Sequence, residues 1–241
     1  MKQLHFPAAE HAAAKWYEEP GRISKALVVL YYGSPPFNYR PMYSAIRDLL
    51  ILNVPYDQIV EGIRKTKLPV AKKSFLEILP LVKSHFDGIQ PDFVNSVSER
   101  RYPIAPGLSI PIRPPLIYGL SGEVVMPWPI FWKNQSLKDD RLSLFASIVQ
   151  DVMTQDPFFD DVKFEVHFYS AVKGSSKRSF TIVPGTDIAP MSEDRRIQML
   201  RDLATGYQLA KAEIEMRTAS STTGPRERGT NPDPNQPSFF D

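Results

Sequence analysis

Apolar residues recur at helical spacing over residues 8–88. Residues 8–18 are rich in alanine, and Pro20 with Gly21 is expected to end a first helix there. Three further amphipathic stretches, at residues 39–53, 56–65 and 70–86, predict short helices joined by tight turns, an arrangement typical of a helix-turn-helix. Pro80 lies inside the last stretch and is expected to kink or shorten that helix.

Residues 89–135 change to alternating apolar positions with dense proline. Leu116, Tyr118 and Leu120 share one face of a strand, Ser121 and Gly122 turn the chain, and a second strand begins after the turn. The pattern predicts a β-hairpin. Because proline cannot donate to a strand ladder, the prolines here are expected at strand ends and on edge strands.

The last third of the chain combines helix and strand patterns. Ser136 is expected to cap a helix over residues 137–152, and residues 162–169 alternate as a half-buried strand does. A turn at 174–176 leads to another strand, and Ser192 is expected to cap a last long helix. From Arg217 the composition predicts a disordered tail. The fold class is therefore α+β, with a helical region at 1–88, an α+β core at 89–216 and a tail at 217–241.

Composition narrows the function classes. The net charge of +2 is too small to indicate nucleic-acid binding by itself. The absence of cysteine excludes disulfides and thiolate metal sites. Apolar runs are too short for a membrane span or a signal peptide, so the sequence predicts a soluble, cytoplasmic protein, and the missing cysteine is typical of a bacterial one.

The segment "RPPLIYGLSGEVVMPWPIFWK" at 113–133 ends a hairpin on a lysine. With the α-β-β-α-β order of residues 68–215, it resembles the PD-(D/E)xK nuclease-like superfamily. Members bind magnesium through an Asp at the start of the hairpin and a Glu two residues before the Lys. Lys133 matches the lysine, but Pro115 and Phe131 stand at the two acid positions. Since a phenylalanine cannot bind a hard cation, the resemblance implies a degenerate, inactive site without a metal.

Two alternatives keep catalysis open. Glu123 opens the second strand and is a candidate migrated ligand, although an acid beside a turn is more commonly only solvated. Glu165 and His167 share one face of their strand, at a spacing that suits a metal or an acid–base pair. We expect instead that they lie on the solvent side of an antiparallel sheet. An active enzyme would be a magnesium-dependent nuclease using these residues with Lys133.

Basic residues gather between the second and third helices of the predicted helix-turn-helix. The stretch "RKTKLPVAKK" contains no acid, and its five basic residues are expected near the turn and the first turn of the following helix, where phosphate contacts would fall. A solvated helix surface is the alternative. The candidate nucleic-acid contacts are Arg64, Lys65, Lys67, Lys72 and Lys73.

The chain ends in "NQPSFFD", where two phenylalanines follow a polar linker. Gln236, Ser238, Phe239 and Phe240 resemble the short motif by which bacterial proteins bind the sliding clamp, with Pro237 and Phe239 replacing its usual leucines. A flexible linker would let the motif reach a pocket on a partner. Aromatics folded back onto the protein's own surface remain the alternative.

Together these features favour a nucleic-acid-associated accessory protein with a nuclease-like, catalytically inactive core that recruits a DNA-processing partner. Two alternatives are an active metal-dependent nuclease with migrated carboxylates and a purely protein-binding subunit of a bacterial complex. Binding that weakens as salt rises would separate a phosphate-binding protein from the last of these.

Overall fold

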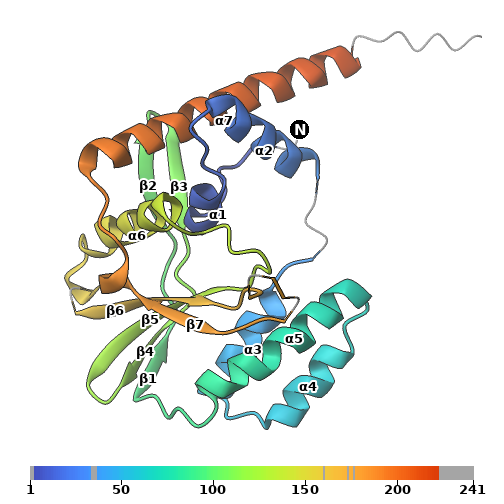
Figure 1. Cartoon of the computed structure of the whole chain (residues 1–241), viewed down its shortest axis with the longest axis vertical. Helices are drawn as coiled ribbons and strands as arrows, with labels where there is room; N and C mark the ends of the chain where they lie inside the picture. The colour runs from blue at the N-terminus through green and yellow to red at the C-terminus, as the bar shows by residue number, and fades with distance from the viewer. Residues whose placement is uncertain (1–2, 34–36, 160, 173, 176, 223–241) are drawn as a thin grey trace, which may run out of the picture.

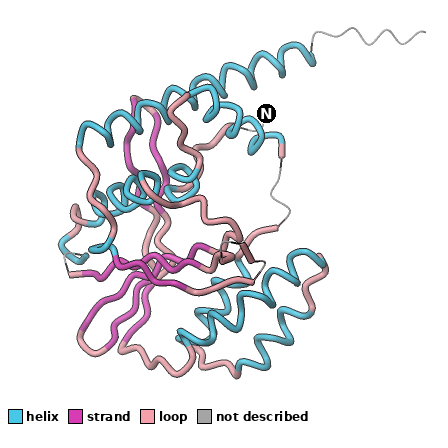
Figure 2. The backbone as a smooth tube through the Cα atoms, viewed as in Figure 1, coloured by secondary structure: helices cyan, strands magenta, loops and turns pink. Residues whose placement is uncertain are grey.

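A five-stranded mixed sheet divides the helices into two groups. The structure is a computed structural model that describes residues 3–33, 37–159, 161–172, 174–175 and 177–222. The helices are α1 (Ala9–Ala14), α2 (Pro20–Tyr32), α3 (Arg40–Leu50), α4 (Tyr56–Arg64), α5 (Pro69–Phe86), α6 (Asp140–Met153) and α7 (Glu193–Thr222), with short 3₁₀ turns at Pro157–Phe159 and Gly185–Asp187. The strands are β1 (Phe93–Asn95), β2 (Arg100–Ala105), β3 (Leu108–Ile112), β4 (Ile117–Leu120), β5 (Glu123–Ile130), β6 (Val162–Phe168) and β7 (Thr181–Pro184). The predicted α+β class is confirmed (Figures 1 and 2).

The sheet order is β1-β4-β5-β6-β7, and β2 with β3 forms a separate hairpin. All neighbours are antiparallel except β5 and β6, which run parallel because α6 crosses over between them. The hairpin predicted around Ser121 and Gly122 is confirmed as β4 and β5, and Ser121 adopts the left-handed region with φ 54°. The element order α5, β4, β5, α6, β6 is thus present, with β1 to β3 placed between α5 and β4.

Alternating side chains bury both faces of the sheet. Met126, Trp128 and Val166 face a core shared with α1, α2, α6, α7 and the β2–β3 hairpin. Val125 and Tyr169 face a second core, built with α3, α4 and α5. Figure 1 shows these two helix groups on opposite sides of the sheet. The helices of residues 1–88 are therefore divided between two cores and do not form one N-terminal unit.

Proline in the central strand β5 is a correction to the expected edge placement. Pro127 and Pro129 lie in β5, which pairs with β6 from Val124 to Ile130 but with β4 only from Glu123 to Val125. The Ile130 carbonyl accepts a hydrogen bond from the Tyr169 N–H on the β6 side, so the alternate residues Pro127 and Pro129 direct their backbone groups to the β4 side, beyond the end of that strand. The missing donors therefore cost no ladder bond. The carbonyl of Pro129 instead accepts a hydrogen bond from the Tyr43 hydroxyl at 3.3 Å.

Several element boundaries differ from the expected ones. Pro20 begins α2 at its first turn, where its missing N–H costs nothing, although the proline was expected only to end a helix. Helix α5 continues through Pro80, and α6 begins at Asp140, so Ser136 is not its cap. Ser192 does accept a hydrogen bond from the Arg195 N–H at the start of α7. Helix α7 extends to residue 222, so residues 217–222 are helical rather than part of a tail.

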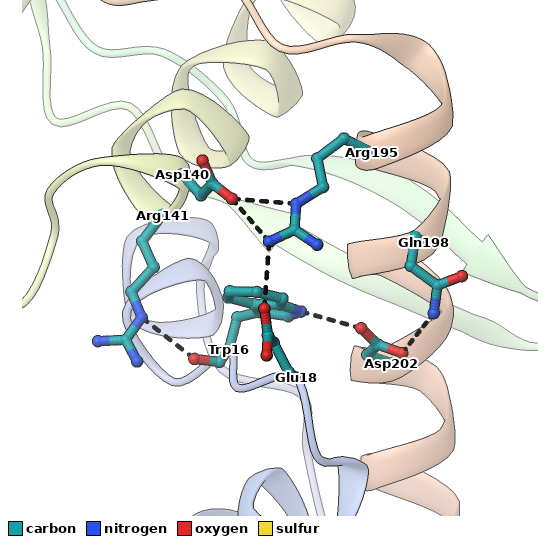
Figure 3. A network of polar contacts seen from close by, with 7 residues as sticks. All are labelled: Trp16, Glu18, Asp140, Arg141, Arg195, Gln198 and Asp202. Carbon is teal, nitrogen blue, oxygen red and sulfur yellow. Dashed lines mark hydrogen bonds and ion pairs between the residues drawn. The ribbon is translucent and has the colours of Figure 1, made fainter.

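A polar network fixes α7 against α6 and the segment after α1 (Figure 3). The Trp16 indole donates to Asp202 at 3.3 Å, and the Gln198 amide donates to the same carboxylate at 2.8 Å. Arg195 donates twice to Asp140, at 2.7 and 3.0 Å, and its guanidinium lies 4.9 Å from the Trp16 ring centroid. These contacts hold the long helix in place on one side of the sheet, away from the face that carries the candidate site.

None of the described helices combines the length and apolar character that crossing a bilayer requires.

Candidate nucleic-acid interface

The position expected for the second metal-binding acid is filled by core packing. Phe131 is 2% exposed, and its ring centroid lies 5.5 Å from that of Tyr39, 5.2 Å from Tyr43 and 5.0 Å from Tyr169. Aromatic pairs at these distances stabilise each other beyond the area they bury. A carboxylate at position 131 would lie in this cluster without water. Position 131 is therefore occupied by a packed aromatic ring, which offers a metal ion no oxygen ligand.

Pro115 stands beside this cluster in a pocket of about 20 Å³. The pocket is lined by Tyr43, Ile46, Arg47, Pro115, Leu116, Pro127 and Pro129. A volume of this size admits a single water molecule, and apart from Arg47 the lining side chains are apolar or aromatic. This end of the hairpin therefore offers a hard cation no oxygen-rich environment.

Glu123 and Lys133 are not brought together. Glu123 opens β5 and forms an exposed ion pair with Lys163 at 2.5 Å, whereas Lys133 is exposed after Ile130 closes the same strand. The strand between Glu123 and Ile130 rises about 23 Å, at roughly 3.3 Å per residue. One metal ion cannot contact both ends, so Glu123 and Lys133 do not form a shared nuclease site.

Glu165 and His167 lie on a covered face, and this corrects the solvent-facing placement. Their strand pairs in parallel with β5, and α5 packs over the face they share. His167 is fully buried and its Nε2 lies 2.8 Å from a Glu165 Oε2, while the Glu165 side chain is 23% exposed. The His85 ring, from the last turn of α5, lies 4.9 Å from the His167 ring at nearly a right angle. The fold thus unites two histidines that are 82 positions apart.

The electrostatics of this cluster follow from burial and from the hydrogen bond. The bond from His167 lowers the pKa of the Glu165 carboxyl, outweighing the opposite effect of its partial burial. Burial lowers the pKa of His85 to about 4, assisted by the nearby His167, so the His85 imidazole is neutral at pH 7. Burial raises the pKa of Tyr118 to about 12. Among the described residues, no three His, Asp or Glu side chains are arranged to hold a metal ion.

The predicted basic residues lie at one end of the α4–α5 pair. Arg64 ends α4 and pairs with Glu61 at 2.6 Å, Lys65 and Lys67 are exposed in the loop at 65–68, and Lys72 and Lys73 occupy the first turns of α5. These positions match the turn and first turn expected from the sequence. Helix α5, however, buries a face against the sheet, so only its N-terminal turns and outer side are free for a ligand.

Arg178 joins the end of β5 to this part of α5. Its buried guanidinium donates from Nη1 to the carbonyls of Phe131 and Tyr169, at 2.9 and 2.8 Å, and from Nη2 to the Ser74 hydroxyl at 3.0 Å. Lys133 is two residues from Phe131, and its carbonyl accepts the Ala171 N–H at 2.8 Å. The carboxyl ends of β5 and β6 are therefore tied directly to the turn of α5 that carries Lys73.

We define the basic face by Lys72 and Lys73 of α5 together with Lys133 and Lys177, which lie in sequence within two residues of the Arg178 contacts. Lys73, Lys133 and Lys177 are exposed and Lys72 is half-buried. Lys72 and Lys73 line an open groove with Pro69, Leu76 and Glu77. Glu77 is the one carboxylate among those lining residues, and Arg178 Nε lies 3.5 Å from it, which offsets its charge. Within the groove, two lysines therefore outweigh one carboxylate.

Three residues of these sites were not recognised from the sequence. Arg178 and Lys177 belong to the basic turn "KGSSKR" between two strands, and that basic composition could have marked them as candidate phosphate contacts. His85 has no such signal, because its neighbour His167 is close only in the folded chain. The tail residues Gln236, Ser238, Phe239 and Phe240 lie outside the described residues.

Comparison with known proteins adds little. No protein-family model matches the chain, and no characterised protein matches its sequence. A solved structure described as the crystal structure of SSO0001 aligns over 90% of this chain and 78% of its own, with 10% sequence identity and a TM-score of 0.30. A likeness at that level carries no argument about fold or function.

Proposed function

We propose that this chain is a nucleic-acid-associated accessory protein whose nuclease-like core is catalytically inactive. The observation that supports it best is the basic face, where Arg178 ties the lysine-bearing end of the hairpin to the lysine-bearing turns of α5. Lysines so grouped suit the phosphate backbone, which supplies the sequence-independent part of nucleic-acid binding.

The packing of Phe131 supports the inactive assignment. A magnesium nuclease needs oxygen ligands where this chain has a buried ring and a proline-lined pocket. We therefore expect binding without cleavage, and no magnesium requirement. In this proposal the tail recruits a DNA-processing partner such as a sliding clamp.

The test compares two double variants by fluorescence anisotropy with labelled single-stranded and duplex oligonucleotides. Lys72→Glu with Lys73→Glu reverses two charges of the basic face, whereas Lys25→Glu with Lys211→Glu reverses two exposed charges on α2 and α7. Each lost phosphate contact lowers the slope of log K against log salt by about 0.9 on duplex DNA. We expect the magnitude of this slope to fall by about 2 in the first variant and to stay unchanged in the control. Equal effects would refute the assignment of the basic face.

A protein-binding role is the second candidate, and it rests on the tail motif. Deleting residues 234–241 should then abolish binding to a purified bacterial sliding clamp and leave the melting temperature unchanged. A large fall in melting temperature would mean that these residues pack on the domain instead.

A further inference from the structure

Two buried imidazole nitrogens lie at the interface of α5 and β6, on rings whose centroids are 4.9 Å apart. His85 Nε2 and His167 Nδ1 are both buried, and neither has a hydrogen-bond partner among the described residues. A buried polar atom left unpaired costs about 1–3 kcal/mol, so two such atoms on neighbouring rings favour a bound ligand or water molecule that pairs with them.

The tautomer of His167 follows from its neighbour. The Glu165 carboxylate lies 2.8 Å from His167 Nε2, and a carboxylate only accepts hydrogen bonds. His167 Nε2 must therefore carry the proton of the 2.8 Å bond. In the neutral ring the lone pair is then on Nδ1, the atom that lacks a partner. A carboxylate that orients an imidazole in this way is the usual outer partner of a metal-binding histidine.

The spacing of the rings suits a shared cation. A tetrahedral centre that binds two imidazoles at the usual distance of about 2.0 Å holds their centroids roughly 5 Å apart. The His85 and His167 centroids are 4.9 Å apart, with an interplanar angle of 87°. His85 is only half-buried, and the Glu165 side chain is 23% exposed, which gives a cation a route from solvent.

We propose that His85 Nε2 and His167 Nδ1 bind a transition cation of the zinc–copper class, with Glu165 orienting His167 and water completing the coordination. Neutral imidazole favours such cations over magnesium or calcium, which require oxygen ligands. With two protein ligands the site agrees with the absence of any group of three among the described residues. It is independent of the proposed nucleic-acid binding, since the basic face and the histidine pair share no residue.

The experiment titrates the untagged full chain with Zn²⁺ at pH 7.5 against a chromogenic chelator. We expect one equivalent to bind, with the affinity lost in both His85→Gln and His167→Gln. Glu165→Gln should weaken binding by about 10- to 100-fold, the usual effect of removing an outer partner. His5→Gln, at an exposed histidine, should bind as the wild type does.

Because His167 is fully buried, its variant risks misfolding, and His85→Gln is the decisive one. Its fold is checked by the far-ultraviolet circular dichroism and melting temperature of the metal-free chain. The proposal is overturned if the wild type binds no zinc, as a bridging water would predict, or if His85→Gln, once folded, binds zinc as tightly as the wild type.

Discussion

Replacing Arg178 by alanine should destabilise the fold more than any other single change of a charged residue discussed above. The side chain is 3% exposed and makes three hydrogen bonds of 2.8–3.0 Å, to Phe131, Tyr169 and Ser74. The variant leaves two carbonyls and a hydroxyl without this donor, and Glu77 without its cation. Each buried polar group left unpaired costs about 1–3 kcal/mol, so with three acceptors affected we expect the unfolding free energy to fall by about 3–5 kcal/mol.

Urea denaturation followed by circular dichroism measures this loss, provided that the dependence on urea is the same in each variant. Arg178→Lys should retain part of the stability, because an ammonium keeps the charge but cannot span three acceptors in a fork. Arg201→Ala, at an exposed position of α7, is the control and should change stability by no more than about 0.5 kcal/mol. A loss below about 1 kcal/mol for Arg178→Ala would show that the guanidinium does not hold the strand ends to α5.

Four further substitutions test the packing and the buried charge. Gly206→Ala should lower the free energy of unfolding by about 1–3 kcal/mol, because the added Cβ would lie 2.6 Å from Ile23. Gly62→Ala, in open space on α4, should raise it by about 0.4–1 kcal/mol. The two melting temperatures should therefore move in opposite directions. Burial raises the pKa of Glu10 from its ordinary value of 4.5 to about 7. The stability that this shift contributes to the fold is therefore fully present below pH 4.5 and is lost as pH rises through 7. Between pH 4.5 and 8 the stability of Glu10→Gln should therefore rise relative to wild type by on the order of 3 kcal/mol in urea titrations, and parallel curves would contradict the burial. Phe131→Glu should lose about 3–5 kcal/mol without gaining magnesium-dependent cleavage, since it places a carboxylate among packed rings; a stable, cleaving variant would reverse the inactive assignment.

Local patterns in the sequence predicted the elements whose signals are local. The alternation over residues 162–169 predicted β6, and the turn at Ser121 and Gly122 predicted the β4–β5 hairpin. Ser192 correctly predicted the start of α7. Helix α2 was missed because Pro20 and Gly21 indicate a stop, yet proline in the first turn is equally a start. The short strand β1 and the β2–β3 hairpin were missed because their prolines and exposed positions hide the alternation.

The environment of the site depended on tertiary contacts. Period-two alternation identifies the two faces of β6 but not what covers each, and both faces turned out to be covered. That is why Glu165 and His167 were expected in solvent. Pro127 and Pro129 indicated an edge strand, since nothing local shows that β4 ends before it reaches them. Arg178 had no predicted role, because its acceptors come from positions 74, 131 and 169.

The most direct test of the central claim is one titration of the full chain against labelled single- and double-stranded DNA and RNA. It is run over a range of salt concentrations, with magnesium or with a chelator, and reads binding and cleavage together. The account predicts binding that weakens steadily as salt rises, unaffected by the chelator and without cleavage. Magnesium-dependent cleavage would contradict the inactive core, and the absence of any salt-sensitive binding would contradict the nucleic-acid interface.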